Sequence, residues 1–310
     1  MRGNRGGHWR GNGTGRGGPR ISEPEPDLAG NAAVSQRRTQ KFGTTETETT
    51  ERYDPSVAVV GTCQQHEKPY YRLTTKPNPS IIRPQSVLED WLPILTKRYE
   101  EGNCDYNYVS DQLRSIRQDL TVQHIKNQFI AKVYLLHIKL AARHDDLSEL
   151  MVCLVCLENL NEDRILKEKQ ALKVFALRIL VSLLQEDRET LVQITSHLRP
   201  HHLQDRYVQF SMQVLQSLNG CRNYYRFAQL STSTPSPVTL YLMEKMADKF
   251  VRKDALRFMC KAYRPTLAID FITSQMCFRD VKQCTDFIQA CGAVVDSTGA
   301  YLMCKESKVV

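Results

Sequence analysis

The positions of apolar residues predict a chain that is helical from residue 84 to about residue 292. In the first segment of this stretch, apolar side chains recur at the spacing that places them on one face of a helix. These positions are Val87, Leu88, Trp91, Leu92 and Leu95. Pro84 suits the first turn of this helix, because the first turn leaves its amide groups unpaired and proline has none to lose. Pro93 is expected to bend it.

Similar stripes of apolar residues recur as far as residue 250. Asp105 opens a segment with Val109, Leu113, Ile116 and Leu120 on one face, and Thr121 is expected to cap a helix over 122–143. Further helical segments cover 147–160, 165–184, 189–198, 202–218, 221–230 and 238–250. Antiparallel helix pairs joined by short turns are typical of an α-solenoid. Because no fixed repeat period is visible, we expect an irregular one.

The last stretch has a different pattern. Three short helical segments over 254–263, 266–276 and 281–292 are followed by two apolar runs, 293–295 and 301–304, which flank a turn ending at Gly299. Two such runs around a glycine-bearing turn predict a β-hairpin. Three helices followed by a hairpin form a winged helix, a relative of the helix-turn-helix. We expect a break near Val251 and Arg252, where the helical stack meets the winged helix.

The N-terminal region lacks the periodicity of a packed element. Residues 1–55 are rich in Gly, Arg, Thr and Glu and are expected to be a disordered tail. Residues 56–83 contain several prolines, so we expect an extended lead-in rather than a helix. The sequence thus predicts an all-α chain in four parts: the tail 1–55, the lead-in 56–83, a helical stack 84–251 and a winged helix 252–310.

Composition narrows the class of protein. The 42 Lys and Arg residues and 34 Asp and Glu residues give a net charge of +8. Five arginines within residues 1–20 supply +5 of this charge, so the remaining residues are nearly neutral: Arg2, Arg5, Arg10, Arg16 and Arg20. Tracts of Arg and Gly are typical of segments that contact RNA with low affinity, although a flexible tail without a partner has the same composition.

The cellular compartment is predicted from the absence of a signal-like segment and of a long apolar run. The first residues have no apolar core typical of a secretory signal, and no apolar run reaches about 18 residues. The ten cysteines are scattered and several fall within apolar helical runs. We therefore expect reduced, buried thiols in a nuclear or cytoplasmic protein that does not enter a membrane.

Motifs for catalysis or cofactor binding are missing. The chain has no phosphate-binding loop, nucleophile elbow or zinc-protease motif. Cys153 and Cys156 form a single Cys-x-x-Cys pair, whereas a zinc site needs four converging ligands, so we interpret them as core residues. His201 and His202 point about 100° apart on a helix, which suits a surface or capping role better than metal binding. We predict no enzyme, metal or cofactor.

The segment SIRQDLTVQ is expected to join two helices, with Ile116 and Leu120 in the core. Arg117 would bridge to a neighbouring element, and Asp119 or Thr121 would cap the next helix. This architectural interpretation is favoured. The alternative is a direct contact of Arg114 and Arg117 with RNA or a protein partner.

Several motifs together resemble the Sac/GANP/Thp family, whose layout is that of PCI domains. The motifs are Tyr71-Arg72-Leu73-Thr74, Pro77-Asn78-Pro79-Ser80, Ile82-Arg83-Pro84, SIRQDLTVQHI over 115–125, Asn223-Tyr224-Tyr225-Arg226-Phe227, and the run from Ala255 to Pro265. The resemblance covers roughly residues 57–305. Gly61-Thr62-Cys63 resembles the export-scaffold branch, but the residues that follow differ from it, and the segment from Asp145 is more apolar than the Thp-like branch has there. The chain thus shares features with both branches, which leaves the branch open.

The resemblance implies a non-catalytic scaffold of a nuclear mRNA processing or export complex. It implies a second PCI-domain protein as partner, a small acidic Dss/Sem-type subunit, and RNA bound without sequence specificity. Arg83, Pro84, Ile116, Arg117, Asp119 and Leu120 are then the residues of a structural motif. The alternative is a pure assembly subunit, for instance of a lid-like or centrosomal complex, without nucleic-acid binding.

Basic residues near the C-terminus are the candidates for RNA contact. Lys245, Lys249, Lys253, Arg257 and Lys261 recur every four residues, which gives a drifting basic ridge on a continuous helix. In the winged helix, the proposed contacts are Lys253, Arg257, Lys261, Arg264 and Lys282, with Arg2, Arg5, Arg10 and Arg16 in the tail. Acidic residues lie between them, so a solvated surface is the competing interpretation. The third helix has few side chains that could recognise bases, which favours contact with the RNA backbone.

Overall fold

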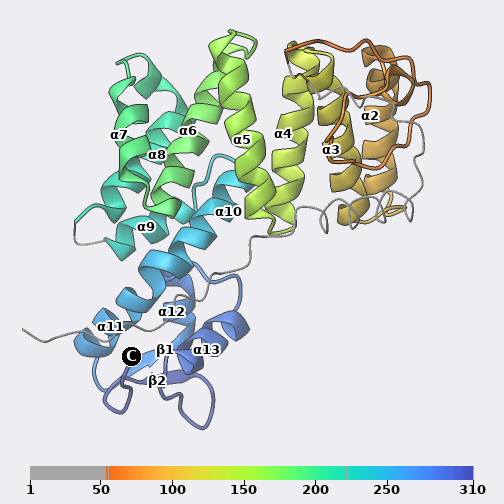
Figure 1. The fold of residues 1–310 in the computed structure, drawn as a ribbon. Helices are drawn as coiled ribbons and strands as arrows, with labels where there is room; N and C mark the ends of the chain where they lie inside the picture. The colour runs from red at the N-terminus through yellow and green to blue at the C-terminus, as the bar shows by residue number, and fades with distance from the viewer. Residues whose placement is uncertain (1–53, 55, 221–222, 310) are drawn as a thin grey trace, which may run out of the picture. The chain divides into compact units, whose positions relative to one another are not determined.

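The protein is described by a computed structural model that covers residues 54, 56–220 and 223–309. The described chain is mostly helical, as the apolar pattern predicts. The α-helices of the stack are α2 (Gln85–Glu100), α3 (Tyr106–Val122), α4 (Gln128–Arg143), α5 (Leu147–Glu162), α6 (Glu168–Gln185), α7 (Arg188–Ser196), α8 (Arg206–Leu218), α9 (Tyr224–Ser231) and α10 (Pro237–Met246). Figure 1 shows α2 to α8 standing side by side as an irregular stack.

The helices of the stack pack as neighbours along the chain. Helix α4 lies against α3 and α5, α6 lies against α7 and α8, and α10 crosses both α4 and α6. One apolar core runs through these contacts, and Leu88, Leu113, Ile116 and Leu154 in it are completely buried. The cysteines in the described part of the chain are all free thiols, and Cys153 lies in this core. The connected core identifies the stack as an α-solenoid.

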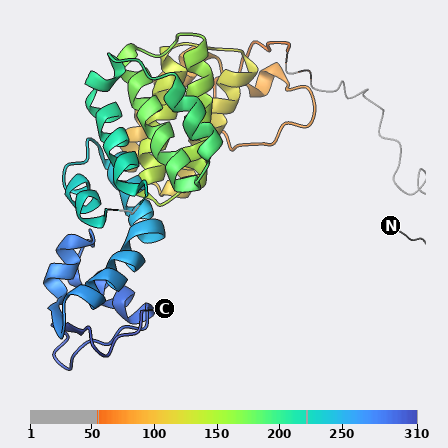
Figure 2. The ribbon, with the colours of Figure 1, turned by 90° about the vertical axis from the view of Figure 1, so that its left-hand side faces the viewer.

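The C-terminal elements form a second group around their own core. They are α11 (Arg252–Ala262), β1 (Thr266–Ala268), α12 (Ile269–Gln275), α13 (Val281–Ala290) and β2 (Tyr301–Met303). Leu256, Ile272, Cys284, Ile288 and Leu302 are completely buried there. Figure 2 shows these elements, in blue, beyond α10 and apart from the yellow and green helices of the stack. Their order is that of a winged helix.

The predicted hairpin is smaller than expected. Strand β2 pairs antiparallel with β1, so that Thr266, Leu267 and Ala268 face Met303, Leu302 and Tyr301. The segment 293–295 meets β2 only at the bridge between Val295 and Leu302. Sequence analysis placed 266–268 in a helix, but these residues are extended and supply the second partner of β2. Pairing on both sides explains how Leu302 is completely buried in so short a strand.

The stack continues into the winged helix without a break. Helix α10 passes through a π-helical turn, η3 (Ala247–Val251), directly into α11. The amide of Arg252 donates to the carbonyl of Ala247, five residues earlier. The expected interruption near Val251 is therefore a change of helical register, which turns the faces of α11 relative to those of α10.

The motif SIRQDLTVQ does not join two helices, contrary to the sequence-based prediction. Residues up to Val122 belong to α3, and the Thr121 hydroxyl donates to the Arg117 carbonyl within that helix at 2.8 Å. Helix α4 begins at Gln128 and is capped by Asn127, whose side chain accepts from the amides of Phe129 and Ile130. Neither Asp119 nor Thr121 is a cap, because the apolar stripe of α3 keeps both inside the helix.

Candidate functional site

Arg83 and Asp119 join the lead-in to α3. Both side chains are almost completely buried, and Arg83 Nε donates to Asp119 Oδ2 at 2.6 Å. The other guanidinium nitrogens donate to the His66 carbonyl at 2.5 Å and to Ser115 Oγ at 2.8 Å. Lys68 adds a second cation, with its Nζ 2.5 Å from Asp119 Oδ1. A buried charge is tolerated only when it is paired and hydrogen-bonded, and these contacts satisfy that condition.

Glutamine side chains of α3 and its C-cap hold the rest of the lead-in. Gln112 exchanges two hydrogen bonds with the backbone of Lys68, at 3.1 and 3.2 Å. Gln123 accepts from the Gly61 amide at 3.1 Å and donates to the Arg83 carbonyl at 2.8 Å. A Cβ at Gly61 would lie 2.4 Å from the Ile82 carbonyl oxygen, so only glycine fits there. The extended lead-in is thus fixed along one face of α3.

A second buried network surrounds Arg117. This side chain donates to Cys153 Sγ at 2.9 Å and pairs with Glu149, and its guanidinium lies 5.3 Å from the centre of the Tyr134 ring. Arg114 Nη2 lies 2.7 Å from Glu149 Oε2. Arg117 of the motif and Arg114 just before it therefore both pair with α5, which favours the architectural interpretation over a direct contact with RNA.

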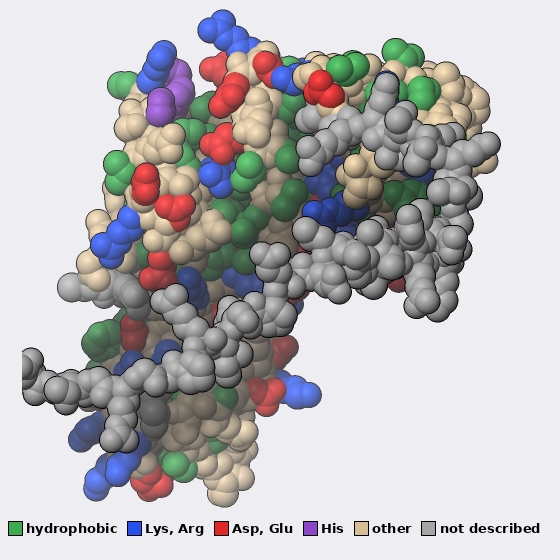
Figure 3. All heavy atoms as spheres, in the orientation of Figure 1, with side chains coloured by type: hydrophobic (Ala, Val, Ile, Leu, Met, Phe, Trp, Pro, Cys, Tyr) green, Lys and Arg blue, Asp and Glu red, His purple; other side chains and the backbone are tan. Residues whose placement is uncertain are grey.

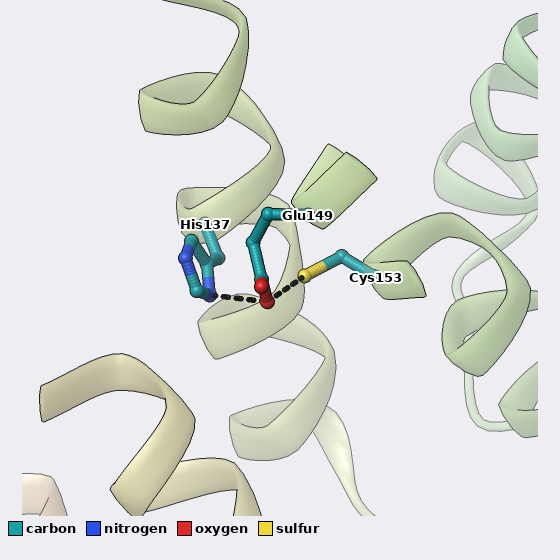
Figure 4. A group of neighbouring side chains, drawn as sticks. All are labelled: His137, Glu149 and Cys153. Carbon is teal, nitrogen blue, oxygen red and sulfur yellow. Dashed lines mark hydrogen bonds and ion pairs between the residues drawn. The ribbon is translucent and has the colours of Figure 1, made fainter. Parts of the chain in front are cut away.

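His137, Glu149 and Cys153 form a compact buried group (Figure 4), whose ligand atoms lie within 4.8 Å of one another. Burial and the nearby charge of Arg117 lower the pKa of His137 to about 3, so its imidazole is neutral. Burial acts to raise the pKa of Glu149, but the charge of Arg117 and the hydrogen bond from Arg114 lower it overall. The group therefore contains one carboxylate, held between two guanidinium groups.

The chemistry of this group does not fit a metal ion. A cation would have to approach Cys153 and Glu149 where Arg117 already donates to both. Burial raises the pKa of the Cys153 thiol, whereas a metal-bound cysteine must be a thiolate. The guanidinium of Arg117 takes the place that a cation would occupy, and the group links α3, α4 and α5.

The basic ridge predicted along residues 245–261 divides in the structure. Lys245 Nζ lies 2.5 Å from Asp145 Oδ1, and Lys249 Nζ lies 2.8 Å from the Leu184 carbonyl and 2.9 Å from Glu186. Through these lysines, α10 contacts the turn after α4, and η3 contacts the end of α6. Arg257 pairs with Asp254 at 3.3 Å. Lys253, Lys261 and Arg264 are exposed, and on the face drawn in Figure 3 Lys and Arg side chains gather over the winged helix.

Cys291 and Cys304 lie at the two ends of this basic surface. Burial raises the pKa of the Cys291 thiol, and the charges of Lys253 and Arg257 act against that increase, so both cations lie near the C-terminal end of α13. A helix C-terminus carries partial negative charge, which favours cations there. Burial also raises the pKa of Cys304, and Arg264 opposes it. The surface thus extends from the end of α13 to the end of β2.

Lys282 lies apart from the other candidates. It is the second residue of α13, whereas Lys253 and Arg257 lie near Cys291, about 13 Å along the helix at 1.5 Å per residue. Lys308 was missed by the sequence analysis: it is exposed, and its carbonyl lies next to Gly292 at the same end of α13 as Lys253. It follows the last predicted element, where no periodic pattern indicated its position. The tail residues Arg2, Arg5, Arg10 and Arg16 lie outside the described residues.

The sequence analysis also missed Arg252, which joins α11 to the segment between α12 and α13. Its side chain is 1 % exposed and donates to the carbonyls of Met276 and Cys277 at 3.1 and 2.6 Å. The guanidinium lies 4.2 Å from the Phe278 ring centre and pairs with Asp248. No sequence signal distinguishes it from its basic neighbours, because only the register of η3 turns it inward.

Aromatic side chains are exposed on the winged helix. Tyr263 and Phe271 meet edge to face with ring centres 5.8 Å apart, and each is about two-fifths exposed. Phe258 and Tyr301 are half exposed. Exposed aromatic residues are enriched where proteins bind partners, so this end of the molecule combines basic and aromatic side chains. In the described residues, none of the helices is long and apolar enough to span a membrane.

Comparison with known proteins adds a family assignment. The family model described as SAC3/GANP family matches residues 34–297, which is most of the chain. The chain belongs to the SAC3/GANP family. The matched region includes the lead-in, the stack and the winged helix up to residue 297, before β2.

Curated relatives in this SAC3/GANP family carry related names. A THP3 homologue of Schizosaccharomyces pombe is 33% identical over 240 residues, covering 77% of this chain and 59% of that protein. Protein THP3 of Saccharomyces cerevisiae is 31% identical and covers 76% and 50% of the two chains. SAC3 family protein A of Arabidopsis thaliana is 30% identical over 96% of this chain and 30% of that protein. The chain thus spans about half the length of the THP3 relatives.

Proposed function

We propose that the chain is a non-catalytic scaffold subunit of a nuclear mRNA processing or export complex. Its membership of the SAC3/GANP family and its similarity to THP3 support this assignment. The described side chains support it as well. Two groups with shifted pKa values, His137 and Cys153, are completely buried in the network around Arg117 and Glu149. Fixed helices with buried ion pairs suit a rigid platform.

The partner is proposed to be a second PCI-domain protein that docks on the winged helix. Phe258, Tyr263, Phe271 and Tyr301 supply exposed aromatic area of the kind that anchors interfaces. In the described chain, β1 pairs with β2 alone, so its outer edge can extend the sheet of a partner. A small acidic Dss/Sem-type subunit is included in the proposal on the family resemblance alone.

RNA contact is proposed for the basic surface of the winged helix. The observation that carries it is that Lys253, Lys261 and Arg264 are exposed on one subdomain, which also exposes Lys308. Arg257 and Lys282 are included as outer contacts. The exposed residues of α13 include Lys282, Asp286 and Gln289, a mixture that favours contact with phosphates rather than recognition of bases. The tail arginines would add a tethered second contact.

A pure assembly subunit is the second candidate, because Arg257 is already paired with Asp254 and acidic side chains lie between the lysines. The two candidates differ in their response to salt. We expect RNA affinity of the partner-bound protein to fall steeply as salt rises, with log K decreasing by about 0.7 per phosphate contact for each unit of log salt. Absence of RNA binding at low salt would leave the assembly subunit. Affinity purification with mass spectrometry identifies the partner.

A further inference from the structure

A second group of cations lies on the helical stack, away from the winged helix. Lys173 of α6 and Arg206 of α8 both lie against the ring of Tyr207, with the Lys173 ammonium 5.5 Å and the Arg206 guanidinium 5.0 Å from the ring centre. Arg206 also donates to the Pro235 carbonyl at 2.5 Å. A shared aromatic ring therefore holds two like charges close together, and both face the same part of the surface.

Lys139 of α4 brings a third positive charge to the same place. Burial lowers the pKa of Lys173, and the charges of Arg206 and Lys139 lower it further, with no carboxylate acting against them. Among the described residues, Lys139 makes no hydrogen bond, ion pair or ring contact, and it is exposed. The three cations come from three helices, α4, α6 and α8, and their like charges repel one another.

Two acidic residues, Asp205 and Glu100, lie beside members of this group. Asp205 precedes Arg206, but its carboxylate caps α8 and accepts from the amides of Tyr207 and Val208 at 2.8 and 3.2 Å. Glu100 and Lys139 line the same small cavity without forming an ion pair. Positive charges that converge without a carboxylate partner are suited to bind an anion, which would relieve their repulsion.

We propose that Lys139, Lys173 and Arg206 bind the phosphates of single-stranded RNA on the helical stack, as a contact separate from the winged helix. The ammonium groups are point charges that can donate to a phosphate from many directions, which suits a flexible strand. The two cations on Tyr207 are already oriented, so less side-chain entropy is lost on binding. The inference rests on the proposed RNA contact of the chain but not on its location in the winged helix.

The surroundings favour RNA over an acidic protein segment. Among the described residues of α4, α6 and α8, no large apolar side chain is exposed. A protein interface needs an apolar centre inside its polar rim, whereas a nucleic-acid backbone is bound by charge. The winged helix has both exposed aromatic and exposed basic side chains, so the two surfaces differ in kind.

The test measures binding of a labelled oligouridylate to the full chain with its partner across a salt series. The variant carries Lys139→Gln, Lys173→Gln and Arg206→Gln, and a control with the same loss of charge carries Lys97→Gln, Lys126→Gln and Arg188→Gln. We expect the first variant to bind about tenfold or more weakly at about 0.1 M salt and to lose about 2 from the salt slope, at about 0.7 per contact. The control should remain within about twofold of wild type.

Further outcomes distinguish the possibilities. Lys139→Glu alone changes an exposed side chain that makes no hydrogen bond or ion pair, so it should weaken binding even if the triple variant is unstable. Equal affinity of wild type and the triple variant would overturn this inference while leaving RNA binding by the winged helix intact. Loss of binding to a polyglutamate peptide with unchanged RNA affinity would assign the surface to an acidic protein instead. A wild-type complex that binds no RNA would overturn the proposed function itself.

Discussion

Replacing Asp119 with Ala should destabilise the protein strongly, because it leaves Arg83 buried without a counter-charge. Asp119 is 1 % exposed and contacts both Arg83 and Lys68, at 2.6 and 2.5 Å. Removing one partner of a buried ion pair costs about 3–5 kcal/mol, far more than the net contribution of the intact pair. For a protein of this size, that loss lowers the Tm by about 6–20 °C.

Urea unfolding followed by circular dichroism measures the change in free energy, and limited proteolysis reports the lead-in. The variant should be cleaved first within 56–83, because Arg83 no longer fixes that segment to α3. Asp163→Ala is the matched control, since its ion pair with Lys126 lies at the surface and is worth about 1 kcal/mol or less. A loss below about 1 kcal/mol for Asp119→Ala would show that the network does not hold the lead-in.

Three further results are expected. Ile116→Ala or Leu120→Ala should cost about 2–5 kcal/mol in urea unfolding, since both side chains are completely buried; a loss under about 0.5 kcal/mol would place them on a surface. Deleting residues 1–55 should leave the Tm unchanged, and a drop of many degrees would show that the tail contributes to folding. The depressed pKa of His137, about 3 against 6.5, means that only the unfolded state binds this proton between these values, so stability falls as pH falls from about 6.5 towards 3. In His137→Gln, the free energy of unfolding should depend less on pH, by about 1.4 kcal/mol per pH unit within this range. If the free energies of wild type and variant changed in parallel with pH, the buried neutral imidazole would be contradicted.

The apolar pattern was sufficient to predict the helical stack and the winged helix. It placed the cap of the next helix at Asp119 or Thr121 instead of Asn127, because all three residue types cap helices and the decision depends on how far the stripe of α3 continues in the core. The predicted hairpin was too large because the strand that pairs with β2 is 266–268. Three residues are too few to show the alternating pattern that identifies a strand.

The buried ion pairs were less accessible to sequence reasoning. Arg83 and Asp119 stand 36 residues apart, and only the fold shows that they meet. Arg117 was expected to bridge to a neighbouring element, and it contacts α5. Its partners Glu149 and Cys153 could not be named in advance, because no local pattern fixes the register of that helix. Lys139, Lys173 and Arg206 are single cations on separate helices and form no motif along the chain. Contacts of this kind depend on packing.

The central claim is that the winged helix binds RNA through its basic surface. Filter binding on the partner-bound protein tests it with wild type, a variant carrying Lys253→Glu, Arg257→Glu, Lys261→Glu and Lys282→Glu, and a deletion of residues 1–20. We expect the charge reversal to weaken binding and flatten the salt slope by about 0.7 per lost contact while the protein remains folded. The deletion should weaken binding further and independently, as a tethered arm adds avidity. Unchanged affinity in the charge-reversal variant would contradict the account and remove the winged helix as an RNA site.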